Sequence, residues 1–67
     1  MEKFLMLKQK GIWYNVGNGK WIVEYEGNYF YVIYPENCIN LNKVRILELK
    51  KDVGKKMIKG KRGIKYG

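Results

Sequence analysis

Residues 12–34 limit the folds open to this chain more than any other feature. They are rich in Trp, Tyr, Val, Ile and Phe, which are favoured on the pleated surface of a β-sheet. A Gly-Asn-Gly run at residues 17–19 and a Gly-Asn pair at residues 27–28 interrupt them. Because Gly and Asn tolerate the positive φ angles that two-residue hairpin turns need, the stretch predicts three antiparallel strands joined by tight turns.

The register of these strands is predicted from the side chains that would share a face. A turn at residues 27–28 places Val23 opposite Val32, and a turn at residues 18–19 places Tyr14 opposite Val23. Both turns then predict one apolar face and one mixed face. The apolar face would hold Ile12, Tyr14, Val16, Trp21, Val23, Tyr25, Phe30, Val32 and Tyr34, and the mixed face Trp13, Asn15, Ile22, Glu24, Glu26, Tyr29, Tyr31 and Ile33.

Two further segments extend the predicted sheet. Residues 44–49 alternate as a strand does, although a helix over residues 41–51 competes with this interpretation because apolar residues recur there every three positions. The β-branched Val44 and Ile46 favour the strand, and residues 4–7 would supply another. We therefore expect an all-β fold of four to five strands, a small antiparallel meander or a partly open barrel of SH3-like or OB-like type.

The net charge of +8 is distributed unevenly along the chain. Residues 1–49 hold six bases and five acids, a net charge of +1, whereas residues 50–67 hold eight bases and one acid, a net charge of +7. Nine of the ten aromatic residues lie before residue 35. This asymmetry predicts a β-rich body (residues 1–49) and a basic Gly/Lys-rich C-terminal segment (residues 50–67), which is either a tail or a last strand through residues 57–58 or Ile64.

Several classes of function are disfavoured by composition. The chain has no histidine and one cysteine, Cys38, whereas a structural zinc site needs about four Cys or His ligands. No nucleophile–base pair, phosphate loop or metal cluster is visible, so we expect neither an enzyme nor a cofactor. A lone cysteine favours a reducing compartment, the cytoplasm. Only four apolar residues in a row stand near the start, too few for a signal peptide or a membrane span, so no membrane association is expected.

The basic segment and the aromatic residues together favour a nucleic-acid-binding module. Lysines beside flexible glycines can follow a phosphate backbone, and exposed rings can stack on unpaired bases. A lysine-dominated set reads charge more than base edges, so sequence specificity would be low, with DNA and RNA both open as partners. The predicted contacts are Lys50, Lys51, Lys55, Lys56, Lys59, Lys61, Arg62 and Lys65 for phosphates and Trp13 or Tyr31 for bases.

Two alternatives remain open at this level. The chain is also interpreted as a small adaptor or inhibitor that binds an acidic surface of a host protein. An abundance of Lys, Asn, Ile and Tyr with a single Pro is typical of an AT-rich genome such as that of a virus or phage, which would place the protein in the host cytoplasm. A homodimer is the second open question, because a domain of about 60 residues buries only about 60% of the surface of its unfolded chain.

Overall fold

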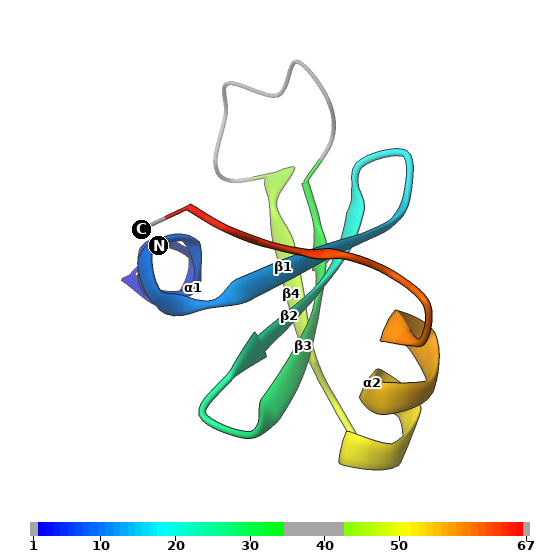
Figure 1. Cartoon of the computed structure of the whole chain (residues 1–67). Helices are drawn as coiled ribbons and strands as arrows, with labels where there is room; N and C mark the ends of the chain where they lie inside the picture. Colours follow the sequence, from blue (N-terminus) through cyan, green and yellow to red (C-terminus); the bar gives the residue numbers. More distant parts are fainter. Residues whose placement is uncertain (1, 35–42, 67) are drawn as a thin grey trace.

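The computed structural model describes residues 2–34 and 43–66. Over these residues, five antiparallel strands form one open sheet in the order β4-β3-β2-β1-β5, and two short helices pack on it (Figure 1). The prediction of a small antiparallel β protein is confirmed. The elements in chain order are α1 (Glu2–Lys10), β1 (Ile12–Gly17), β2 (Lys20–Tyr25), β3 (Asn28–Ile33), β4 (Arg45–Leu49), α2 (Lys51–Ile58) and β5 (Gly63–Lys65).

The β2–β3 hairpin turns one residue earlier than the sequence predicts. Its turn is made by Glu26 and Gly27, with φ angles of 50° and 76°, so both central residues are in the left-handed region that such tight turns require. Val23 therefore pairs with Phe30 instead of Val32. Because this change in register is an even number of residues, every side chain of β2 and β3 keeps the face predicted for it.

A β-bulge at Val16 changes the face of most of β1. Gly17 pairs with Lys20 as the predicted turn requires, but Asn15 pairs with Trp21, so Val16 is the extra residue between them. The side-chain Oδ1 of Asn15 accepts a hydrogen bond from the Gly17 N–H at 3.0 Å. A one-residue slip moves each side chain to the opposite face, so the faces predicted for residues 12–15 are wrong.

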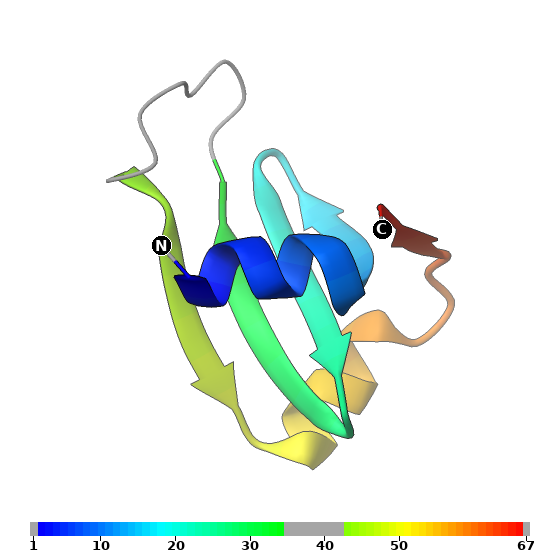
Figure 2. The ribbon, with the colours of Figure 1, turned by 90° about the vertical axis from the view of Figure 1, so that its left-hand side faces the viewer.

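Helix α1 covers one face of the sheet and closes the main core (Figure 2). Phe4 and Leu7 are three residues apart, so both point toward the sheet from one side of the helix. The strand predicted at residues 4–7 is wrong, and the charges show why a helix is favoured: Glu2 lies in its first turn and lysines in its last, matching the helix dipole. The buried core cluster consists of Phe4, Leu7, Trp13, Val23, Phe30 and Val32.

Helix α2 packs on the opposite face, where Gly54 meets the ring of Tyr29. A glycine inside a helix costs roughly 1 kcal/mol relative to alanine. At position 54 a Cβ atom would collide with the Tyr29 ring, so only glycine lets the helix lie this close to β3. Packing against the sheet thus outweighs the poor helix propensity of this segment.

The remaining two strands agree with one of the interpretations open for each segment. Residues 45–49 form β4, so the predicted strand is confirmed there. In the C-terminal segment a short strand does form through Ile64, and it pairs antiparallel with β1. Residues 57–58, the other site considered for a last strand, belong to α2.

Candidate nucleic-acid interface

Three cross-strand rows of side chains make up the sheet face that carries α2. Directly paired residues of antiparallel strands point to the same side about 5 Å apart, so the observed register defines the neighbours in each row. We name the rows from the end of the sheet that holds the β1–β2 turn toward α2. The outer row is Arg45, Ile33 and Lys20; the middle row is Leu47, Tyr31, Ile22 and Tyr14; the inner row is Leu49, Tyr29, Glu24, Ile12 and Lys65.

Helix α2 covers the inner row and leaves the outer row and the β4 end of the middle row accessible. Tyr29, beneath Gly54, is 5% exposed, and Ile22 is fully buried. Leu47 at the edge of the middle row is 57% exposed, and its neighbour Tyr31 is half-buried. The face therefore presents an aromatic and apolar strip, made of Tyr31, Ile33 and Leu47, beside the helix.

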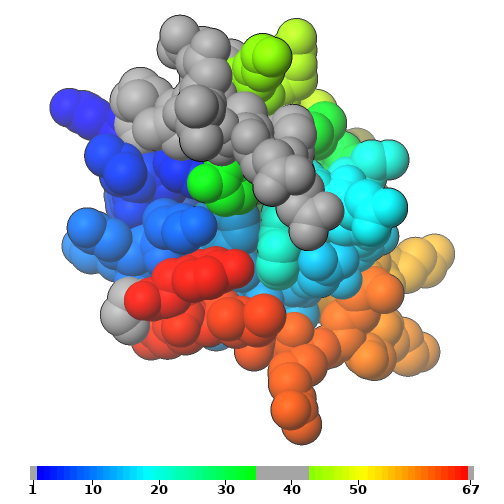
Figure 3. Space-filling model, turned by 90° about the horizontal axis from the view of Figure 1, so that it is seen from above, coloured from blue at the N-terminus to red at the C-terminus, as the bar shows by residue number. Residues whose placement is uncertain are grey.

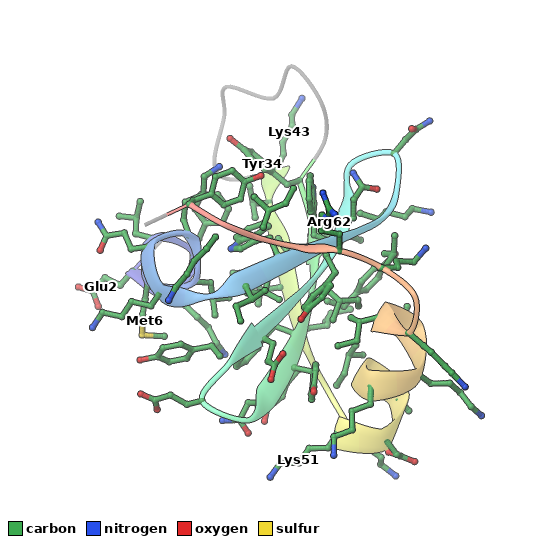
Figure 4. The ribbon with its side chains drawn as sticks, in the orientation of Figure 1. Glu2, Met6, Tyr34, Lys43, Lys51 and Arg62 are labelled. Carbon is green, nitrogen blue, oxygen red and sulfur yellow. The ribbon has the colours of Figure 1, made fainter. Side chains whose placement is uncertain are left out.

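All eight bases predicted as phosphate contacts are exposed. Figure 4 shows Lys51 at the start of α2 and Arg62 where the chain approaches β5, well apart in this view. The part of the chain around residues 59–62 stands out from the surface (Figure 3). The structure places Lys50, Lys51, Lys55, Lys56 and Lys59 along α2 and its two ends, Lys61 and Arg62 in the connection to β5, and Lys65 on β5.

The register adds to the site two basic residues that are not among the predicted contacts. Lys20 and Arg45 both flank Ile33 in the outer row, and both are exposed. They lie across the apolar strip from α2, so basic side chains flank Tyr31 on both sides. In the sequence they belong to the near-neutral body. The alternation of Arg45 with Leu47 is visible there, but the face that Lys20 and Arg45 share follows only from the pairing of β3 with β2 and β4.

Trp13 lies in the core and not on the open face that its sequence pattern predicts. Its side chain is 1% exposed, and its Nε1–H donates a hydrogen bond of 2.8 Å to the carbonyl oxygen of Leu7. The rings of Phe4, Trp21 and Tyr66 pack against it edge to face, with centroids 5.6–6.1 Å away. In this position the indole has no free surface on which a base could stack, so Tyr31 is the predicted stacking residue that the structure leaves accessible.

An acid on this face is paired with a tyrosine. The Tyr14 hydroxyl lies 3.4 Å from Oε1 of Glu24, to which it donates a hydrogen bond. Burial, followed by the negative charge of Glu24 and this hydrogen bond, raises the pKa of Tyr14 above its ordinary value. Glu24 thus lies in the inner row beside α2, away from the outer row that holds Lys20 and Arg45.

Within residues 2–34 and 43–66, no group of three His, Cys, Asp or Glu side chains could hold a metal ion. Neither α1 nor α2 has the length and apolar character needed to cross a bilayer. Comparisons with protein families, curated protein sequences and solved structures found no match to this chain.

Proposed function

We propose that this protein is a non-enzymatic nucleic-acid-binding module of low sequence specificity. The observation that carries the proposal is the concentration of exposed bases on α2 and on the chain that leads to β5. Residues 50–67 contain eight bases and a single acid, Asp52. These bases border a sheet face whose other margin holds Lys20 and Arg45.

The bases on α2 would contact phosphate groups. Lys51 and Lys55 are four residues apart, and Lys59 follows at the C-terminal end of the helix, so successive ammonium groups are offset by about 6 Å along one flank. Each phosphate that they neutralise releases condensed counterions, which is a favourable term that falls as salt rises. Contacts of this kind position a nucleic acid without reading its sequence.

The strip of Tyr31, Ile33 and Leu47 would contact the nucleobases of the bound strand. A flat aromatic side chain between two sets of positive charges can stack on an unpaired base, and such stacking contributes roughly 1–3 kcal/mol. Bases within a duplex are already stacked on each other and are not available for this contact. We therefore propose that the protein binds single strands more tightly than duplexes.

The test is fluorescence anisotropy with labelled single- and double-stranded DNA and RNA at several salt concentrations. We expect single strands to bind more tightly, with an affinity that falls log-linearly with salt, by a slope of about 0.7 for each phosphate contact. The variant Lys55→Gln should lower this slope, whereas the matched control Lys10→Gln, an exposed lysine on α1, should leave it unchanged. A wild-type protein that bound none of the four ligands at low salt would refute the proposal.

A second candidate function is the binding of an acidic surface of a host protein, as an adaptor or inhibitor. The observation that favours it is the presence of large exposed apolar side chains beside the bases: Leu47 on β4 and, four residues apart on α2, Val53 and Met57, which are 37–57% exposed. A viral or phage origin and a place in the host cytoplasm belong to this candidate. It predicts one stoichiometric partner whose co-purification survives nuclease treatment, whereas nucleic acid as partner predicts its loss.

A further inference from the structure

The ammonium group of Lys8 lies among four aromatic rings. Its Nζ is 4.5 Å from the ring centroid of Tyr66 and 5.0 Å from that of Tyr34. The centroids of Trp13 and Phe4 are 5.6 Å and 5.9 Å away. All four distances are within the roughly 6 Å over which the quadrupole of an aromatic ring attracts a cation. We call these four rings the Lys8 cage.

The rings of the Lys8 cage also hold one another in place. Phe4 packs edge to face on Tyr34, with centroids 5.2 Å apart, and Trp13 packs in the same way on Tyr66 at 5.6 Å. Phe4 and Trp13 meet at 6.1 Å with their planes at 90°. Trp13 is buried and hydrogen-bonded, so at least one wall of the cage is rigid.

Tyr66 is the exposed wall of the cage. It is 46% exposed, and it follows β5, whose three residues are all exposed. Pairing with β1 holds this short strand on one side only. Helix α1 contacts β5, and the last described part of the chain, in red, lies beside the N-terminal segment, in blue (Figure 3). Lys8 therefore connects the N-terminal helix to the last described residue of the chain.

We propose that the Lys8 cage is an alkylammonium-binding site whose ligand is Lys8 of the same chain, and that its occupancy fastens β5 to α1. Cages of this form bind methylated ammonium groups, because the rings replace the water that such a weakly hydrated cation loses. A primary ammonium is more strongly hydrated, but Lys8 is attached to the site and so has no entropy of association to lose. The proposal stands whether or not the protein binds nucleic acid.

Amide hydrogen exchange measured by NMR tests the fastening. A cation–π contact at an exposed site is equivalent to a change of about 2- to 5-fold in an equilibrium constant. We therefore expect β5 amides to exchange about 2- to 5-fold faster in Lys8→Met, while Lys8→Arg, which keeps the charge, stays close to wild type. The matched control is Lys10→Met on the same helix, which should leave β5 unchanged.

A double-mutant cycle separates the cage from a general effect on stability. If Lys8 acts through Tyr66, Lys8→Met should change β5 exchange much less when Tyr66→Leu is already present. Equal effects of Lys8→Met in both backgrounds, or no effect in either, would overturn the fastening role.

Chemical rescue tests the site itself. In Lys8→Ala, added tetramethylammonium chloride should slow β5 exchange again, and its methyl resonance should move upfield from the ring currents of the cage. Sodium chloride at the same ionic strength should do neither, and wild-type protein, whose cage is filled, should not shift the resonance. If tetramethylammonium has no more effect than sodium on Lys8→Ala, the cage is not a cation site and the proposal is wrong.

Discussion

The two faces of the sheet are covered by helices of similar length, yet they are built in opposite ways. The face under α1 is closed by large side chains: Phe4 and Leu7 of the helix meet Trp13, Val23 and Phe30 of the sheet, all at most 6% exposed. Helix α2 contacts the other face through Gly54, and among the large hydrophobic side chains that the structure describes on that face, Ile22 and Tyr29 alone are buried.

The two faces therefore have different roles: one provides stability, and the other provides accessible surface. Each fully buried large apolar side chain contributes about 1.5–3 kcal/mol, so the face under α1 provides most of the hydrophobic stabilisation. The face under α2 has few such side chains but keeps its bases, an accessible tyrosine and three exposed aliphatic side chains. We expect substitutions on the first face to change folding and substitutions on the second to change binding.

The largest effect should follow from Trp13→Ala. Truncation of a buried aromatic costs about 3–5 kcal/mol, and here it also removes one of the two N–H groups that donate to the Leu7 carbonyl, the other being that of Gly11. Domains have only about 5–15 kcal/mol of stability in total, so the variant should be largely unfolded in circular dichroism at 37 °C. Tyr31→Ala, on the opposite face, is the control and should unfold in urea close to the wild-type midpoint. Similar losses from both variants would contradict the division between the faces.

Gly54→Ala should have the next largest effect, a loss of stability. In an exposed helix this change stabilises by roughly 1 kcal/mol, but the new Cβ would collide with Tyr29, and overpacking costs about 1–3 kcal/mol. We expect a lower thermal midpoint. Val53→Ala, one residue earlier and 40% exposed, should change stability by less than about 0.5 kcal/mol. A rise in the midpoint of Gly54→Ala would show that α2 does not lie this close to β3.

A third prediction concerns binding on the face under α2. Tyr31→Ala should weaken single-strand binding by about 1–3 kcal/mol through loss of stacking, with little change in the salt slope. Tyr31→Phe keeps the ring and should bind as wild type does. If the alanine variant bound single strands as tightly as wild type, Tyr31 would not belong to the interface.

The smallest effect is expected from the alkaline titration of Tyr14. Its pKa is raised in the folded protein, chiefly by burial and then by Glu24. Above about pH 10 the unfolded chain loses this proton while the folded chain retains it, so the contribution of Tyr14 is complete below that pH and is lost as pH rises through the folded pKa. Tyr14→Phe should therefore lose less stability than wild type between pH 9 and 11. Urea midpoints measured over this range check the sign.

Strand positions were predictable from the sequence because alternation and turn residues agree over residues 12–34. Moving the turn of β2–β3 by one residue shifts the cross-strand pairing by two, which keeps every side chain on its predicted face. The residues of β2 and β3 that face α1 are therefore predicted correctly, although their pairing partners are not. The bulge at Val16 was missed because it depends on one local hydrogen bond from Gly17 to Asn15 and on the burial of Trp13. A prediction from strict two-residue alternation assumes an unbroken strand, so it does not allow for the extra residue of a bulge.

The helices were harder to predict for two different reasons. Four consecutive apolar residues fit a strand as well as a helix, and the signal that separates them, Glu2 with Lys8 and Lys10 at opposite ends, is weak for so short a segment. Gly54 argues against a helix by its propensity, but a tertiary contact with Tyr29 decides the outcome. The exposed bases of residues 50–65 were visible in the sequence, whereas Lys20 and Arg45 join them only through the register.

The pairing of β5 with β1 has a consequence for how the chain folds. The hairpins of β1–β2 and β2–β3 join residues close in sequence, but Ile12 pairs with Lys65 across most of the chain. Closing a long loop costs more conformational entropy than closing a short one, and distant pairings form more slowly. We expect the three-stranded meander to assemble first and the seam between the two ends of the chain to close last. The rate of that closure would then set the time at which the bases near β5 reach their final positions.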